Sequence, residues 1–441
     1  MSALPTVAGA FRSGFMASSR LSALPLLVLP RPTVQACCQR FLLKTSAPSQ
    51  KLSSLPSSSF STSYQTPSTQ HYSPNFDTLY NTMEPFTYTQ NPSRVIFGSG
   101  TLKQLPTELT RQNLSKPLLL TTPEQVSQGE MVQSLLTDFT VAGIFSQATM
   151  HTPTEVTDKA LEYMKSTAAD CLISIGGGST IGLGKAMSIR TGLPHICIPT
   201  TYAGSEMTPI LGETAAGVKK TRSDPKILPG TVVYDVDLTM TLPVGMSSTS
   251  GVNAIAHAVE ALYATNANPV TSLLALEGIR ALAIALPQIV ASPQSPEARQ
   301  LALYGAWLCG SCLGSVGMSL HHKLCHTLGG TFNLPHAQTH TIVLPHALAY
   351  NLPGLAPEVQ KRLGDAFPES NGDPIRGLNV LLEKLGVEKA LKAYGMKEED
   401  VDKAADLAVA NPYANPRKVE RDGVREVIRR AWAGEPAKQD L

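Results

Sequence analysis

The sequence predicts an α/β N-terminal nucleotide-binding domain on a parallel sheet, followed by an all-α C-terminal domain. Two observations carry this prediction. Between about residues 94 and 242, short apolar runs alternate with amphipathic helical stretches, as βαβ units require. From residue 251 to 432 the chain is instead rich in Ala and Leu at helical spacing.

The strands and helices follow from local patterns. Four apolar runs are typical of buried parallel strands: residues 118–121, 171–175, 195–199 and 231–234. Between them, residues 154–165 form an amphipathic helix. Helical spacing later covers residues 252–264, 272–291, 296–313 and 319–328, and Gly329 and Gly330 are expected to form the next turn. We divide the chain into an extension, an α/β dinucleotide-binding domain, a helical catalytic domain and a tail: residues 1–85, 86–245, 246–435 and 436–441.

Composition excludes several classes of protein. The 441 residues are 42% hydrophobic with a net charge of +2, which gives no reason to expect a nucleic-acid partner. Prolines and serines interrupt every apolar run before it reaches the roughly 18 residues of a membrane span. The seven scattered cysteines argue against a disulfide framework and for a reducing compartment.

The N-terminus differs in character from the rest of the chain. No acidic residue precedes Asp77, and the same stretch is rich in Arg and Ser, as in mitochondrial transit peptides. We therefore predict the mitochondrial matrix. A disordered extension or a gene-model artefact, which would imply the cytoplasm, stays open as an alternative. A secretory signal is less favoured, because Pro25 interrupts its apolar stretch.

A glycine turn is the strongest local motif. A predicted strand runs into three glycines, and a helix is expected to begin at Ser179 or Thr180. Such a turn lets the backbone approach a pyrophosphate, and the N–H groups of the helix start can donate to it. The spacing is not G-x-G-x-x-G, so a plain tight turn remains an alternative. The predicted nucleotide-binding residues are this turn and two threonines after the next strand: Gly176, Gly177, Gly178, Ser179, Thr200 and Thr201.

Histidines in the helical half form a candidate active site. Asn253 and His257 lie four residues apart, as do His322 and His326, so each pair shares one helix face. His336 follows after a break. Imidazoles at this spacing, joined by a ligand from another segment, often bind a metal. The competing interpretation, that they satisfy hydrogen bonds in a core, is weaker for a set than for one histidine.

Five motifs in order resemble the iron-containing alcohol dehydrogenase family, and within it the maleylacetate reductases. They occupy residues 176–185 (GGGSTIGLGK), 199–208 (PTTYAGSEMT), 253–264 (NAIAHAVEALYA), 321–336 (HHKLCHTLGGTFNLPH) and 411–417 (NPYANPR). The resemblance runs from about residue 86 to 432 and implies the architecture shared with dehydroquinate synthase. It also implies a homodimer, an active site between the domains, and NADH or NADPH at the glycine turn.

Two departures from the family pattern bear on the cofactors. Metal-dependent relatives have an Asp where this chain has Asn253, with ligands mapping to His257, His322 and His336. They have a second Asp where this chain has Gly182. An amide oxygen is a poor ligand for Fe²⁺ or Zn²⁺, so we predict a site that works without metal. The strand at residues 118–121 also lacks the acid that in relatives accepts the adenosine ribose, so NADPH is expected to be accepted beside NADH.

The resemblance implies reduction of the carbon–carbon double bond of maleylacetate, a dicarboxylate from aromatic-compound degradation, to 3-oxoadipate. Hydride transfer to the alkene leaves an enolate, which the mapped histidines and Asn253 are expected to stabilise in a cationic or donor-rich pocket. His326 is the first candidate proton donor and Tyr202 the second. Lys323 is a candidate for binding a substrate carboxylate.

Three alternatives stay open at this point. One is a metal-dependent alcohol dehydrogenase or mitochondrial hydroxyacid–oxoacid transhydrogenase of the same family. Another is a lyase related to dehydroquinate synthase, although the basic residues for a phosphate substrate are not apparent. The last is a nucleotide-binding interaction module that has lost catalysis, which the retained histidines disfavour.

Overall fold

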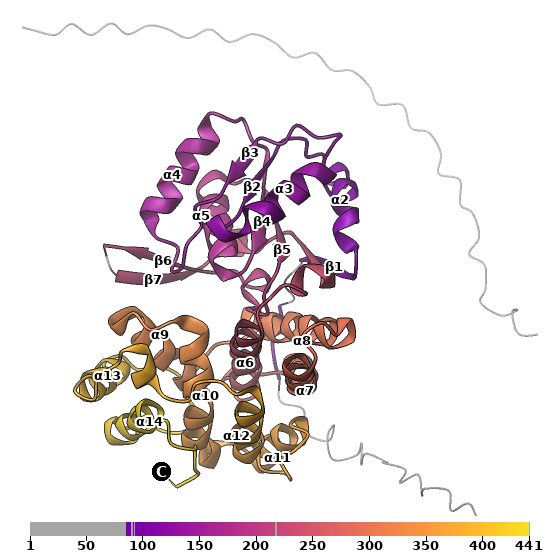
Figure 1. Cartoon of the computed structure of the whole chain (residues 1–441). Coiled ribbons are helices and arrows are strands. Elements are labelled where there is room, and N and C mark those ends of the chain that lie inside the picture. Colours follow the sequence, from indigo (N-terminus) through magenta and orange to yellow (C-terminus); the bar gives the residue numbers. More distant parts are fainter. Residues whose placement is uncertain (1–84, 90, 92, 217, 441) are drawn as a thin grey trace, which may run out of the picture. The chain divides into compact units, whose positions relative to one another are not determined.

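The computed structural model describes residues 85–89, 91, 93–216 and 218–440 (Figure 1). The transit-peptide prediction for residues 1–85 therefore lies, apart from residue 85, outside the described residues. The described elements begin with strands that alternate with helices and continue as helices alone. The predicted fold class is confirmed.

Six parallel strands form the sheet in the order β1-β8-β5-β4-β2-β3. Their bounds are Arg94–Gly98 (β1), Pro117–Leu120 (β2), Gly143–Phe145 (β3), Cys171–Gly176 (β4), His195–Pro199 (β5) and Thr231–Asp235 (β8). The four predicted strands are all present, within a residue or so of the expected bounds. Two edge strands, β1 and β3, were not predicted, and neither was an antiparallel hairpin outside the sheet, β6 (Ile210–Ala215) with β7 (Val218–Ser223).

The sheet is covered on both faces, which explains why its strands are continuously apolar. Along β2, Leu119 packs into one cluster with α2 (Leu105–Arg111) and α3 (Val126–Leu135). Its neighbours Leu118 and Leu120 pack into another, with α4 (Thr154–Lys165) and α5 (Gly178–Thr191). Successive side chains of a strand point to opposite faces, so each face needs its own apolar residues.

The second half is helical, as predicted. Its longer helices are α6 (Val244–Ala261), α7 (Pro269–Ala291), α8 (Pro296–Ser315), α9 (Leu320–Phe332), α10 (His336–Asn351), α11 (Pro357–Ala366), α12 (Pro374–Leu385), α13 (Asp400–Val409) and α14 (Arg421–Ala433).

Two helix bounds differ from the prediction for physical reasons. Helix α6 begins eight residues earlier than the predicted start at residue 252, because Ser247, Thr249 and Ser250 bond back to carbonyls one turn earlier and so enter the helix buried. Gly329 and Gly330 lie inside α9, which ends instead at Phe332 and is followed by Asn333 in the left-handed conformation (φ 54°).

Helix α7 corrects the statement that no stretch is long and apolar enough to cross a membrane. By length and composition its 23 residues could cross a membrane, and half of its most apolar stretch is buried. The helix packs against α6, α8, α11 and α12. Its partners are those of a core helix, and length and composition alone are weak evidence for a span.

The loop of residues 200–208 follows β5 and contacts both the glycine turn and helix α8. The Thr200 N–H donates to the Gly176 carbonyl at 3.1 Å. At the other end, the buried Lys185 ammonium of α5 donates to the Ser205 carbonyl at 2.5 Å and the Thr208 hydroxyl at 2.9 Å. Burial lowers the pKa of Lys185 to about 8. In the middle of the loop, the backbone of Gly204 packs closely against the backbone of Gly310 in α8.

We predict that Gly310→Ala lowers the free energy of unfolding by about 1–3 kcal/mol, as overpacking does in well-packed cores. A Cβ there would lie 2.7 Å from the carbonyl oxygen and 2.9 Å from the Cα of Gly204. Urea unfolding measures the effect. Ser311→Ala on the same helix adds no atoms and is the control, since the Ser311 hydroxyl only bonds back to the Trp307 carbonyl. Equal stability of the two variants would contradict this close contact.

Candidate active site

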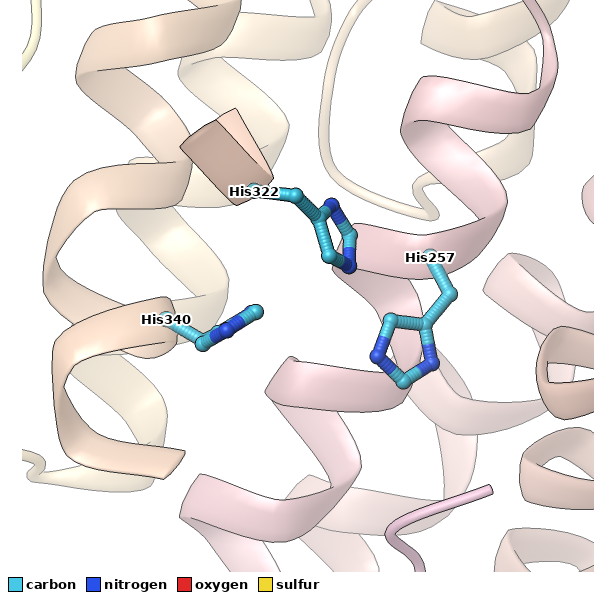
Figure 2. Close-up of side chains that lie close together, drawn as sticks. All are labelled: His257, His322 and His340. Carbon is cyan, nitrogen blue, oxygen red and sulfur yellow. The ribbon is translucent and has the colours of Figure 1, made fainter. Parts of the chain in front are cut away.

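Three histidines from three helices converge inside the helical half (Figure 2). His257 comes from α6, His322 from α9 and His340 from α10. All three are buried, and one ring nitrogen from each lies within 4.8 Å of the others. The close-up shows the three rings facing a common space.

A line of imidazoles leads from this buried group toward the surface. The His340 ring lies 4.2 Å, centroid to centroid, from that of the half-buried His336. His336 stacks on the exposed His326 at 6.5 Å, and the His326 ring lies 6.2 Å from that of His322. All four histidines predicted for the site therefore belong to one cluster.

Burial keeps the inner imidazoles neutral at pH 7. It lowers the pKa of His322 to about 3 and that of His321 to about 4, and it lowers the pKa values of His257 and His340 well below the ordinary value. Neighbouring histidines add to the effect. Of the two expected forms of the pocket, cationic or donor-rich, burial favours the second, because neutral imidazoles offer N–H donors and nitrogen lone pairs.

Several polar atoms of the inner group have no hydrogen-bond partner among the described residues. They are His257 Nδ1, His321 Nδ1, His322 Nε2, both ring nitrogens of His340, and Asn253 Oδ1. Buried polar atoms are rarely left unpaired, so such a concentration marks a place for a ligand. The Asn253 amide makes one long contact, donating from Nδ2 to the Ala203 carbonyl at 3.5 Å.

A buried carboxylate contacts the Nδ1 atom of His322. Glu260 of α6 is fully buried, and its Oε2 lies 2.7 Å from His322 Nδ1. The same carboxylate accepts the backbone N–H groups of Ser319 and His321 at 2.9 and 2.7 Å. Burial raises the pKa of Glu260, and these N–H donors oppose that rise.

Tyr202 lies outside the histidine cluster, and its role as a second proton donor stays a prediction. Its hydroxyl is fully buried and accepts a hydrogen bond from Arg299 at 3.4 Å. The same Arg299 nitrogen donates to the Ser247 hydroxyl at 2.7 Å. Ser247 precedes His257 by ten residues on α6, which is about 15 Å of helix. Tyr202 thus packs at the far end of α6.

Lys323 contacts an aromatic ring. Its ammonium lies over the ring of Tyr413, 5.8 Å from the ring centroid. Tyr413 belongs to the NPYANPR segment, so this side chain faces the loop that follows α13. Carboxylate binding by Lys323 stays a prediction.

The glycine turn has the shape needed for a phosphate group. Gly176 has φ +149°, and a Cβ there would lie 2.5 Å from Gln125 Oε1, so the turn excludes side chains. Helix α5 begins at Gly178 with no side-chain cap and no acid in its first turn. A Cβ on Gly178 would meet nothing within 4 Å. The unpaired N–H groups of a helix start beside open space make an anion site.

The two predicted threonines border this turn. Thr200 is buried and its hydroxyl accepts from Gln125 Nε2 at 2.9 Å. A Cβ on Gly177 would lie 2.9 Å from the Thr201 methyl group, so Thr201 stands directly beside the glycines. The Thr201 hydroxyl has no partner among the described residues. The structure thus brings the predicted nucleotide-binding residues together.

Sequence reasoning missed His340, His321 and Glu260. His340 follows His336 by four residues on a helix, the same signal that identified the other pairs. Glu260 is one turn beyond His257 and therefore shares its helix face. No signal in the sequence shows that His321 faces inward, where its Nε2 contacts the His340 carbonyl at 3.0 Å.

Two family models match the chain over most of its described length. Residues 92–236 match the model described as iron-containing alcohol dehydrogenase. Residues 247–432 match the C-terminal model of the Fe-containing alcohol dehydrogenase family. Together they span the sheet and the helices described above.

Among curated proteins, the chain is 51% identical to a maleylacetate reductase of Rhizobium sp. (strain MTP-10005), over 80% of this chain and 99% of that protein. It is 51% identical to the maleylacetate reductase of Sphingobium indicum, over 80% of this chain and 98% of that protein. Among solved structures, the maleylacetate reductase of Agrobacterium tumefaciens superimposes with a TM-score of 0.77 at 49% identity, covering 80% of this chain and all of that one.

We predict that Gly178→Asp weakens NADH binding at least about tenfold without lowering stability. The new carboxylate would stand at the start of α5, where it repels a pyrophosphate yet interacts favourably with the helix dipole by about 0.3–1 kcal/mol. Fluorescence titration with NADH and thermal unfolding measure the two effects. Gly178→Asn, similar in size and uncharged, should bind NADH more tightly than the Asp variant. Equal affinity of the two variants would argue against an anion at this turn.

Proposed function

Because the chain belongs to the iron-containing alcohol dehydrogenase family, we propose that it reduces the carbon–carbon double bond of maleylacetate to 3-oxoadipate with NADH or NADPH. The observation that carries the proposal is the high identity to maleylacetate reductases along both family segments. A buried histidine cluster, with the neutral Asn253 beside it, supports the same conclusion.

The reaction requires three events. Hydride leaves the nicotinamide and bonds to the alkene carbon β to the ketone. The electron pair of the double bond then moves to form an enolate, with negative charge on the ketone oxygen. A proton finally bonds to the carbon α to the ketone, and the ketone is restored. The protein must therefore position a cofactor, stabilise an oxyanion and deliver one proton.

The glycine turn and the uncapped start of α5 would bind the pyrophosphate, with Thr200 and Thr201 beside the nicotinamide. His326 is the proposed proton donor, because it is the exposed member of the cluster and can exchange protons with solvent. Neutral imidazole N–H groups and the Asn253 amide would donate to the enolate oxygen. One such preorganised donor contributes about 3–4 kcal/mol in other enzymes.

The residues of the inner group also fit a divalent metal. His257, His322 and His340 would hold it through ring nitrogens that lack hydrogen-bond partners within the described part of the chain. Imidazole suits zinc, iron, cobalt and nickel, and a bound ion would polarise the ketone oxygen. This fit favours the metal-dependent dehydrogenase of the same family as the second candidate function. The neutral Asn253 supports the first candidate, a reductase that turns over without metal.

We also propose that the enzyme accepts NADPH beside NADH, that it is a homodimer, and that residues 1–85 direct it to the mitochondrial matrix. The matched relatives are covered almost completely by 80% of this chain, and the family models begin at residue 92. The extension thus lies outside the matched catalytic region.

We expect exhaustively chelated protein to oxidise NADH or NADPH when maleylacetate is added, as followed by nicotinamide absorbance. Turnover without metal supports the reductase, because histidine and amide donors then suffice for the enolate. Activity that returns only with added iron or zinc would keep the substrate and overturn metal independence. If neither condition gives turnover, the substrate assignment is wrong, and aldehydes and hydroxyacids are then the substrates to test.

We expect His326→Ala to lower kcat with maleylacetate at least about a hundredfold, as the loss of a proton donor typically does. Steady-state kinetics measures this. The control is Thr327→Ala, which alters the next residue of α9 and removes only a hydroxyl that bonds back to the Lys323 carbonyl. A decrease of less than about tenfold in the His326 variant would remove it from the proton-transfer role.

A further inference from the structure

The side chain of Glu260, on α6, contacts several groups at the start of α9. Its Oε2 atom lies 2.7 Å from His322 Nδ1. The same oxygen accepts the backbone N–H groups of Ser319 at 2.9 Å and of His322 at 3.4 Å. Its other oxygen accepts the His321 N–H at 2.7 Å. We propose that Glu260 is a positioning residue that fixes His322 in the tautomer with its proton on Nδ1.

The argument rests on which groups can donate. The three backbone N–H groups have no lone pair to offer, so both oxygens of Glu260 act as acceptors toward them. They belong to the start of α9, whose dipole favours a negative charge at this place. Both oxygens already face N–H donors, so the fourth close contact, at 2.7 Å, is one in which imidazole Nδ1–H donates to Oε2.

The tautomer decides what His322 can do. With its proton on Nδ1, a neutral imidazole has a lone pair on Nε2, and that atom has no partner among the described residues. It faces the group formed with His257 and His340. His322 therefore accepts a hydrogen bond or binds a cation, and does not itself donate to an enolate. The enolate donors of the proposed function are then His257, His340 and Asn253.

Asn415 also caps the start of α9, so it provides a comparison that distinguishes the positioning of His322 from capping of the helix. Asn415 Oδ1 accepts the Leu320 N–H at 3.3 Å, and its amide donates to Asn351 of α10 at 2.7 Å. Asn415 thus supports α9 at its first turn, as Glu260 does. No contact between Asn415 and the His322 ring is present among the described residues, so losing Asn415 removes a cap and leaves the imidazole held.

The test compares three variants of the chelated full-length protein labelled with ¹⁵N-histidine. Glu260→Met removes both acceptors, Glu260→Gln retains one oxygen, and Asn415→Ala removes only the cap. Nitrogen NMR chemical shifts report the tautomer, and the His322 signals are assigned by their loss in His322→Gln. We expect Nδ1–H in the wild type, in Glu260→Gln and in Asn415→Ala, and a shift toward Nε2–H in Glu260→Met.

Kinetics provides the second readout, and it rests on the proposed function. We expect kcat in Glu260→Met to fall at least about tenfold below that of Asn415→Ala, the range seen when such supporting carboxylates are removed. KM for NADH should change little, because the glycine turn is untouched. Glu260→Gln should recover part of the loss.

A wild-type spectrum with the proton on Nε2 would overturn the proposal, even if Glu260→Met fails to fold. It would also be overturned by an unchanged tautomer in Glu260→Met, or by equal losses of kcat in Glu260→Met and Asn415→Ala. The tautomer is measured without substrate. A protein that keeps Nδ1–H but never reduces maleylacetate would therefore contradict the proposed function and leave this inference standing.

Discussion

The buried carboxylate of Glu260 is the interaction on which the histidine cluster depends. A carboxylate in a dry interior is costly unless hydrogen bonds compensate for lost water. Here the compensation comes from the start of α9, whose first N–H groups have no partner within the helix. The carboxylate and the N–H groups compensate each other for the water that both lose on burial. A buried N–H donor left without a partner would cost about 1–3 kcal/mol. The pairing joins α6 to α9 at the place where both present histidines to the same space.

Helix α10 is tied to that pair by different bonds. The Asn415 side chain joins Leu320 at the start of α9 to Asn351 at the end of α10. Nearer the site, the His321 ring contacts the His340 carbonyl. Three helices are thereby held around imidazole rings, each of which has at least one buried nitrogen without a hydrogen-bond partner among the described residues. Burial keeps these imidazoles neutral, so the cluster can offer donors and lone pairs without accumulating charge before the enolate forms.

The sequence was informative where backbone geometry or simple periodicity decides the structure. Buried strands such as β4 and β5 are apolar on both faces, and the glycine turn needs residues without a Cβ, so both were predictable. The start of α6 was not, because its serines and Thr249 look like a loop until their hydroxyls find carbonyls of the preceding turn. The placement of Tyr202 was not predictable, because a motif position does not fix where a side chain points. Its hydroxyl lies beside buried Arg299, near the start of α6. Glu260 was overlooked because a single acid in an apolar helix has no pattern until its partners are known.

These differences reflect two ways of building one site. The proposed phosphate site is made of backbone N–H groups and the absence of side chains, and the loop after β5 carries that geometry to Gly204 and Ala203 beside α6 and α8. The proposed oxyanion site is made of side chains from α6 and α10, with His322 of α9 beside them. A change from carboxylate to amide at position 253 therefore alters the charge offered to a ligand while the cofactor site stays intact. Under the proposed function, metal-dependent and metal-free reduction on this fold differ in a few inward-facing residues such as Asn253, while Glu260 and the start of α9 keep His322 in place.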